Sequence, residues 1–221
     1  MSKKPLIALV HATPASMAPA KAALTEELPD ATVWNLLDDR LLADADAAGG
    51  LTPDLRARME RLIDHALTEG ADGVLLTCSM YGPVAHAMTS ERPILASDDA
   101  AFRDVAEQEV GTVLVVASFA AALHDAEARL TEFLRERGSG STVRGAVAEA
   151  AFAAALRGDT EQLLAALLDA VRPHADSVDA VLLAQYSLTP AAESLAKATG
   201  LPVFSGPQSA ATTLRRLLTA G

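Results

Sequence analysis

The stretch Gly73-Val-Leu-Leu-Thr-Cys-Ser-Met-Tyr-Gly-Pro83 returns in altered form as Ala180-Val-Leu-Leu-Ala-Gln-Tyr-Ser-Leu-Thr-Pro190, 107 residues further along the chain. Two flanking blocks repeat in the same order, at offsets of 106 and 109 residues: Ile7–Val10 as Val113–Val116, and Pro93–Leu95 as Pro202–Phe204. Three matched blocks at a nearly constant offset indicate an internal duplication. The chain is therefore predicted to consist of two related halves.

Short aliphatic runs alternate with longer helical patterns along both halves. The runs are Leu6–Val10, Ala31–Trp34, Gly73–Leu76, Pro93–Leu95, Val113–Val116, Ala180–Leu183 and Pro202–Phe204. Several of them are continuously apolar, which is typical of parallel strands covered on both faces. Between the runs, Thr52-Pro53 marks the start of a helix, and the Ala-rich segment 145–156 is predicted to be a closely packed helix.

These patterns predict an α/β fold made of two pseudo-symmetric flavodoxin-like lobes, each built on a parallel sheet. The first lobe is expected to comprise residues 1–105 and the second residues 106–221, with a C-terminal helix that can pack across onto the first lobe. In open parallel sheets, ligands bind beyond the carboxyl ends of the strands. We therefore expect the active site in the cleft between the two lobes.

The composition narrows the class of protein. The 221 residues include 18 Lys and Arg against 29 Asp and Glu, which gives a net charge of −11, and half of them are hydrophobic. This acidic balance disfavours nucleic acid or an anionic membrane as a partner. No apolar run reaches the roughly 18 residues of a membrane span, and the first run is too short for a signal peptide. We therefore expect a soluble cytoplasmic protein. A single cysteine excludes an internal disulfide and a cysteine-based zinc site.

Polar side chains follow the strand ends of both halves. The candidates are His11, Thr13, Thr77, Cys78, Ser79, Ser118, Gln185 and Ser187. Each loop leads into a predicted helix, where backbone N–H groups and the helix dipole favour an anion. These loops contain no lysine or arginine, and a small carboxylate held by hydroxyls and amides needs none. The same setting is expected to lower the pKa of the Cys78 thiol.

Structural roles for these residues remain open at this point. A lone cysteine is commonly a small buried apolar residue, and His11 could simply bond to a loop carbonyl. The pairs Asp38-Asp39 and Asp98-Asp99 suit helix caps or loops, and the run from Gln185 to Ser187 could serve packing. The sequence has no Gly-rich phosphate loop and no HExxH or GxSxG motif, so phosphoryl transfer, zinc hydrolysis and α/β-hydrolase chemistry lack support.

The pattern resembles the aspartate/glutamate racemase superfamily along nearly the whole chain. The resemblance is carried by Gly70–Ser79, Leu183–Pro190 and Gly200–Ser205, and by Asn35–Asp39 and Arg157–Thr160. It implies two flavodoxin-like lobes, no cofactor and no metal, frequent homodimers, and a small carboxylate substrate bound between the lobes. It also implies one catalytic cysteine at each of the two matched strand ends, where one thiolate removes a proton and the opposite thiol returns one.

One of the two cysteines is missing from this chain. The first family cysteine corresponds to Cys78, but the second corresponds to Gln185, within Ala184-Gln-Tyr-Ser187. A glutamine amide does not titrate and cannot act as an acid or base. His11, Tyr81 and Tyr186 could replace the missing thiol, and of these only His11 titrates near neutral pH. Because the first and third strands are neighbours in this strand order, we expect His11 and Cys78 to meet on one side of the substrate.

Members with unequal halves offer precedents for a single thiol. Arylmalonate decarboxylase keeps one cysteine in its second half, and maleate isomerases use a first-half cysteine as a nucleophile. We therefore hypothesise a cofactor-independent isomerase that acts at the carbon next to a carboxylate of a small acid or amino acid. Cys78 would be the acid/base or nucleophile, with His11 as the second catalytic residue. The substrate-binding residues would be Thr13, Thr77, Ser79, Ser118, Gln185 and Ser187.

Three alternatives to this hypothesis stay open: a single-cysteine decarboxylase or lyase of the same superfamily, a cysteine-nucleophile hydrolase, and a non-catalytic protein that binds small carboxylates.

Overall fold

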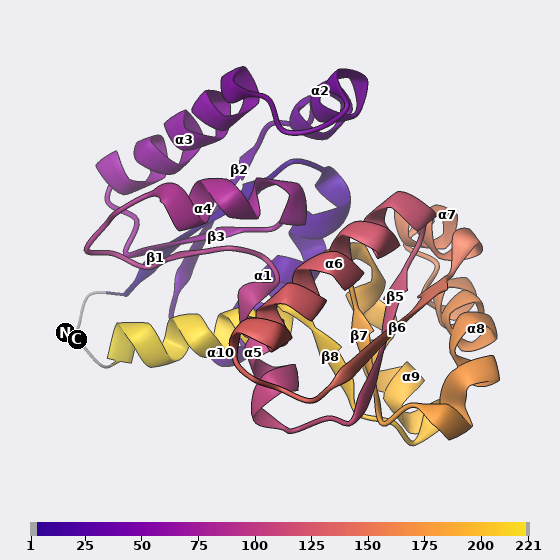
Figure 1. Ribbon diagram of the computed structural model, residues 1–221. Coiled ribbons are helices and arrows are strands. Elements are labelled where there is room, and N and C mark those ends of the chain that lie inside the picture. Colours follow the sequence, from indigo (N-terminus) through magenta and orange to yellow (C-terminus); the bar gives the residue numbers. More distant parts are fainter. Residues whose placement is uncertain (1–3, 220–221) are drawn as a thin grey trace. The chain divides into compact units, whose positions relative to one another are not determined.

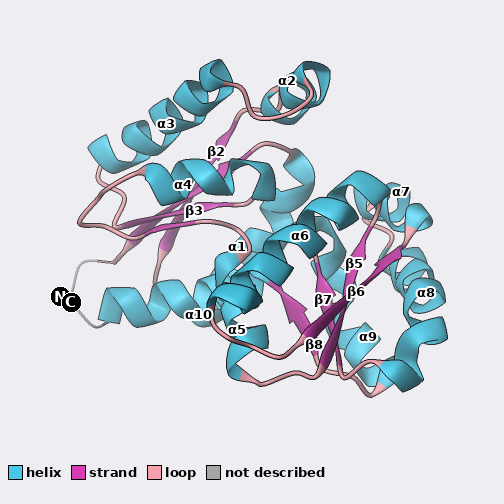
Figure 2. Ribbon diagram, viewed as in Figure 1, coloured by secondary structure: helices cyan, strands magenta, loops and turns pink. Residues whose placement is uncertain are grey.

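The computed structural model describes residues 4–219 and contains, within them, two four-stranded parallel sheets (Figures 1 and 2). The strand orders are β2-β1-β3-β4 and β6-β5-β7-β8. The strands are β1 (Leu6–His11), β2 (Thr32–Leu37), β3 (Gly73–Leu76), β4 (Ile94–Leu95), β5 (Thr112–Ala117), β6 (Thr142–Val147), β7 (Ala180–Leu183) and β8 (Val203–Ser205). The predicted α/β fold with two lobes of parallel sheet is confirmed.

Helices connect the strands in both sheets. The α-helices are α1 (Met17–Glu27), α2 (Leu41–Ala48), α3 (Pro53–Thr68), α4 (Gly82–Ala87), α5 (Asp99–Glu107), α6 (Ala120–Glu136), α7 (Glu149–Arg157), α8 (Thr160–Val171), α9 (Ala192–Thr199) and α10 (Gly206–Thr219). Short 3₁₀ helices are η1 (Pro14–Ser16), η2 (Ser79–Tyr81), η3 (Arg172–Ser177) and η4 (Tyr186–Ala191). None of these helices is both long and apolar enough to cross a bilayer.

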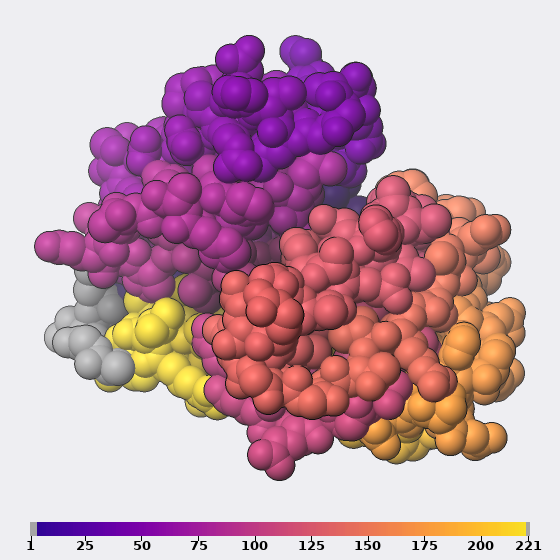
Figure 3. All heavy atoms as spheres, viewed as in Figure 1, coloured from indigo at the N-terminus to yellow at the C-terminus, as the bar shows by residue number. Residues whose placement is uncertain are grey.

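The chain forms two compact units. Unit 1 contains the residues up to Asp99 together with those from Pro207 onward, and unit 2 contains Ala100–Gly206. The division expected between residues 105 and 106 lies within α5. The last helix, α10, belongs to unit 1, where Leu214 lies against Gly73 of β3 and Arg215 pairs with Glu27 of α1 at 3.0 Å. In the space-filling view, the yellow atoms of α10 lie directly against magenta atoms of unit 1 (Figure 3).

The two sheets share their strand order and their register. Ile7 of β1 lies opposite Gly73 of β3, and the matched residues Val113 and Ala180 lie opposite each other in unit 2. Just beyond the last strand residues, the Thr77 N–H donates to Val10 O at 3.1 Å, and the Ala184 N–H donates to Val116 O at 2.9 Å. The duplication in the sequence therefore corresponds to a duplicated backbone, so residues of the two units can be compared position by position.

One strand differs from the sequence-based expectation. The pattern of segment 145–156 predicts a helix, but its first residues belong to β6, and α7 begins only at Glu149. Arg144 and Gly145 interrupt the apolar run that would mark a strand. A Cβ at Gly145 would meet the ends of the Glu127 and Leu123 side chains of α6, which would have to move aside. The prediction is wrong for these residues because parallel pairing with β5 extends the strand to Val147 and outweighs the helix preference of the alanines.

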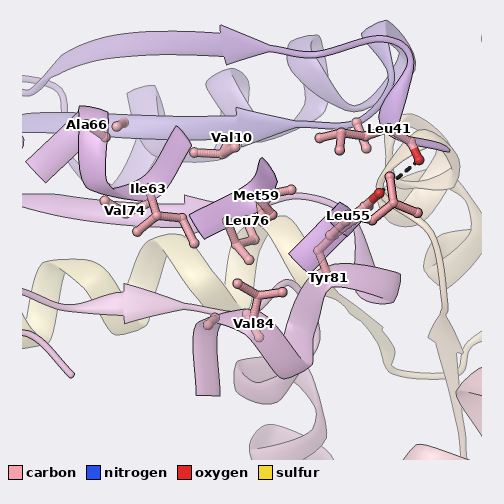
Figure 4. Packing of buried hydrophobic residues seen from close by; sticks show 14 of the residues in the cluster. Val10, Leu41, Leu55, Met59, Ile63, Ala66, Val74, Leu76, Tyr81 and Val84 are labelled. Atoms are coloured by element: carbon pink, nitrogen blue, oxygen red, sulfur yellow. Dashed lines mark hydrogen bonds between the residues drawn. The ribbon is translucent and has the colours of Figure 1, made fainter. Parts of the chain in front are cut away.

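Both faces of each sheet are covered by helices. In unit 1, one face packs on α2, α3 and α4 through a cluster that includes Val10, Met59, Ile63 and Leu76 (Figure 4). The other face is covered by α1 and α10 (Figures 1 and 2). In unit 2, α7, α8 and α9 supply one buried cluster, and α5 and α6 supply the other. Each large aliphatic side chain buried in this way contributes about 1.5–3 kcal/mol to folding.

A matched pair of carboxylates holds the start of the central strand in each unit. Asp72 accepts the Leu6 N–H at 2.8 Å, and Asp179 accepts the Thr112 N–H at 2.6 Å. We expect Asp179→Ala to lower the free energy of unfolding by about 1 kcal/mol, because the strand loses a hydrogen bond to a charged group at an exposed position. Urea denaturation measures the change. Asp179→Asn keeps an acceptor oxygen and should lose less; equal losses in the two variants would contradict this role.

Candidate functional site

The strand end of unit 1 carries Cys78. This residue follows β3 in an extended conformation (φ −126°, ψ 120°) and precedes η2. Its side chain is half-buried and packs against the cluster that contains Val74 and Leu76. Pro83 lies in the first turn of α4. However, η2 has three residues and α4 six, so a thiolate here gains less from a helix dipole than it would at the start of a long helix.

His11 is completely buried and bonded through both ring nitrogens. Its Nδ1 lies 2.9 Å from Thr77 Oγ1 and 3.1 Å from Ser16 Oγ, and its Nε2 lies 3.0 Å from Asn35 Oδ1. The two hydroxyls lie 2.8 Å apart, and Ser16 Oγ donates to the carbonyl of Thr13 at 2.9 Å. We refer to His11, Ser16, Asn35 and Thr77 as the His11 network.

The His11 network and Cys78 lie on opposite faces of the unit 1 sheet. Ala8, Val10 and Ala12 belong to the same cluster as Cys78, whereas the side chain of His11, which lies between them in sequence, bonds to Thr77. Successive side chains of a strand point to opposite faces, so Thr77 and Cys78 also diverge. The expectation that His11 meets Cys78 on one side of a substrate therefore does not describe this arrangement, although β1 and β3 are neighbours as expected.

Burial lowers the pKa of His11 from its ordinary value of 6.5, and the hydrogen bond with Asn35 opposes this effect only in part. Protonation thus favours the unfolded chain, and stability is lost as the pH falls from 6.5 towards the folded-state pKa. We expect the melting temperature of the wild type to fall more between about pH 7.5 and about pH 5.5 than that of His11→Asn. Thermal unfolding at both pH values measures this; equal decreases would show that His11 does not supply the pH dependence.

Tyr81 packs within the core of unit 1. Its ring is buried, and its hydroxyl donates to the carbonyl of Leu41 at 2.8 Å (Figure 4). Burial, with a smaller effect from the negative charge of Cys78, raises the pKa of Tyr81 to about 12. A phenol with this pKa keeps its proton at neutral pH and is already committed to a carbonyl. Tyr81 is therefore a poor replacement for the missing thiol.

The strand end of unit 2 carries a glutamine amide in a defined orientation. Gln185 Oε1 accepts two hydrogen bonds from Ser118, one from its backbone N–H at 2.7 Å and one from its hydroxyl at 2.8 Å. Because a backbone N–H can only donate, the atom facing Ser118 must be the amide oxygen. The –NH₂ group of Gln185 is consequently held on the other side, as an oriented pair of donors. Ser118 itself is buried.

The remaining predicted substrate-binding residues divide by exposure. Thr77 and Ser118 are buried, and their hydroxyls are occupied by His11 and Gln185. Three others are half-buried: Ser79 begins η2, Ser187 lies in η4, and Thr13 precedes η1. The hydroxyl of Thr13 accepts the Ala15 N–H at 3.4 Å. Tyr186 is buried. Ser16 and Asn35, which complete the His11 network, are not among the site residues that the sequence pattern indicates.

One member of each acidic pair forms an ion pair within unit 1. Asp38 forms an ion pair with Arg58 of α3 at 2.5 Å, and Arg58 also pairs with Asp44 at 2.8 Å. Asp99 begins α5 and lies 2.6 Å from His86 of α4. Within residues 4–219, no three His, Cys, Asp or Glu side chains are grouped so that they could hold a metal ion.

Several solved structures share this fold. An aspartate racemase from Picrophilus torridus matches with a TM-score of 0.74 and 14% identity, over 96% of this chain and 93% of that one. A glutamate racemase from Francisella tularensis subsp. tularensis, in complex with D-glutamate, matches with a TM-score of 0.67 and 14% identity, over 100% and 82% of the two chains. A glycine-to-cysteine mutant of arylmalonate decarboxylase, in a sulfate-ion-associated form, matches with a TM-score of 0.59 and 21% identity, over 98% and 94%.

The sequence comparisons gave no match, either to a protein-family model or to a curated protein. The structural matches show that the chain has the two-lobed α/β fold of these aspartate and glutamate racemases.

Proposed function

We propose that this chain is an enzyme of the aspartate/glutamate racemase type that acts, without a cofactor, at the carbon next to the carboxylate of a small acid or amino acid. The observation that carries this proposal is the pair of matched strand ends. One presents the half-buried thiol of Cys78, and the other presents the amide of Gln185, oriented by Ser118. Together they supply one proton-transferring group and a set of hydrogen-bond donors.

Cys78 is the acid/base residue of the proposed reaction. Its thiolate takes the proton from the carbon next to the carboxylate, and the electron pair of the C–H bond moves into the carboxylate to form an enediolate. The thiol then returns a proton to the same carbon. Positioned acid/base groups typically accelerate such transfers about 10²–10⁴-fold.

Donors at the strand ends stabilise the charge that develops on the carboxylate oxygens. The oriented –NH₂ of Gln185 and the half-buried hydroxyls of Thr13, Ser79 and Ser187 suit this role. Thr77 and Ser118, whose hydroxyls are already engaged, act by positioning their neighbours rather than by touching the substrate. Preorganised donors of this type are worth about 2.7–4 kcal/mol each in the transition state.

A decarboxylase is the second candidate, and the single thiol favours it. Loss of CO₂ from a malonate leaves the electron pair of the C–C bond on the α-carbon as an enediolate, and the Cys78 thiol supplies the one proton required. No second acid or base is needed, which agrees with the non-titrating Gln185 at the matched strand end. The similarity to the fold of arylmalonate decarboxylase supports the same alternative.

The test is proton exchange in D₂O followed by NMR over a panel of amino acids, hydroxy acids, malonates and maleate, with wild type and Cys78→Ala side by side. Cys78-dependent deuterium incorporation is expected. Retention of configuration indicates that Cys78 is the only base, and racemisation reveals a second one; CO₂ release from a malonate selects the decarboxylase. Ligand binding without any exchange or conversion would overturn the proposal in favour of a non-catalytic carboxylate-binding protein.

A further inference from the structure

The His11 network has no counterpart in unit 2, although the backbone there is the same. By strand register, His11 corresponds to Ala117 and Asn35 to Gly145. Thr77 corresponds to Ala184, since each follows the third strand and donates its N–H to the matched residue of the central strand. The residue five positions after Ala117, in the place of Ser16, is Ala122. Four polar residues of unit 1 are thus alanine or glycine in unit 2.

Unit 2 serves as an internal control for the fold. It builds the same four-stranded sheet, in the same order and register, without any of these polar groups. Burying polar groups is favourable only when every one of them is paired, and a buried group left without its partner costs about 1–3 kcal/mol. Stability of the sheet therefore does not explain why unit 1 retains the network. What distinguishes unit 1 at this edge is the thiol of Cys78.

The contacts of the network form one continuous series. Asn35 Oδ1 can only accept, so the hydrogen of the neutral His11 ring lies on Nε2, and Nδ1 is an acceptor that faces the hydroxyls of Thr77 and Ser16. The Ser16 hydroxyl donates to the Thr13 carbonyl, so the Thr77 hydroxyl is the donor to Nδ1. The two hydroxyl oxygens lie 2.8 Å apart, which links the two sides of the network. Every member of the network therefore has a hydrogen-bond partner.

The chain of hydrogen bonds joins the two loops that carry proposed site residues. At one end it holds the carbonyl of Thr13, in the loop after β1. At the other it holds the side chain of Thr77, which is covalently joined to Cys78. Since Thr77 and Cys78 diverge to opposite faces of the sheet, fixing Thr77 on the buried side determines the direction of the Cα–Cβ bond of Cys78 on the other.

We propose that the His11 network positions Cys78, with His11 and Thr77 acting as positioning residues that never touch the substrate. This inference rests on the proposed function for its catalytic consequence, but not for its effect on the thiol. Misplacing a reacting group by about 1 Å can cost about 10²-fold in rate. The network is therefore expected to affect turnover much more than substrate binding.

The test compares Thr77→Val, which keeps the shape but removes the hydroxyl, with Thr77→Ser, which restores it. Two readouts are used: the pH profile of Cys78 alkylation by iodoacetamide, and kcat and KM for a substrate found in the D₂O panel. We expect Thr77→Val to change the alkylation profile and to lower kcat about 10–100-fold with KM nearly unchanged, and Thr77→Ser to recover most of both. Thr189→Val is the matched control for alkylation and folding, because the buried hydroxyl of Thr189 has no partner among the described residues.

The outcomes separate this proposal from the proposed function. If Thr77→Val melts at a lower temperature but keeps the wild-type alkylation profile and kcat, the network serves stability alone and the proposal is overturned. If the wild type converts nothing in the panel, the proposed function fails, while the alkylation profiles still decide the role of the network. If Thr77→Val does not fold, the same two readouts are measured on Asn35→Gly. This variant introduces the residue that unit 2 has at the corresponding position.

Discussion

Cys78→Ala is expected to lower kcat for proton exchange about 10²–10⁴-fold, the range that a positioned acid/base group contributes. Cys78 is the only thiol of the chain, and Gln185, at the matched strand end, cannot exchange a proton in its place. The side chain is half-buried at the edge of the unit 1 core, so its removal should have little effect on folding. Deuterium incorporation and the melting temperature are measured together.

Cys78→Ser is the matched variant, because it preserves the size of the side chain and a hydrogen bond donor while removing the readily formed thiolate. It should be nearly as inactive as Cys78→Ala. Full exchange activity in either variant would show that the proton is carried by another group.

Gln185→Glu is expected to weaken binding of a carboxylate substrate about 10–150-fold. The glutamate can still accept both hydrogen bonds from Ser118, so the side chain keeps its anchor. It loses the two N–H donors, which are worth about 1.5–3 kcal/mol towards a charged group, and it adds a like charge. Titration calorimetry or KM measures the loss.

Gln185→Ala separates the two contributions. It removes the donors and the anchor without adding charge, so its effect on binding should be smaller than that of Gln185→Glu if repulsion contributes. A Gln185→Glu variant that binds as tightly as the wild type would show that this amide does not face the substrate.

The two repeats carry a sequence signal for the His11 network. The polar residues at positions 11, 35 and 77 of the first repeat correspond to alanine or glycine at positions 117, 145 and 184 of the second. The signal is hard to read from the sequence because the pattern of β6 predicts a helix. No strand position in the second repeat is then recognised as the match of Asn35. Gly145 also interrupts the apolar run by which a strand is recognised in a sequence.

The duplicated α/β fold and the matched positions of Cys78 and Gln185 follow from the sequence alone, because apolar periodicity and the order of strands are local properties of the chain. The directions in which these side chains point depend on the tertiary structure. The central strand of unit 1 is apolar on both faces, so no alternation indicates that His11 lies opposite Cys78. The partners that orient the key groups also lie far away in sequence: Thr77 is 66 residues from His11, and Gln185 is 67 residues from Ser118. Such pairs meet only when parallel strands are brought side by side across intervening helices.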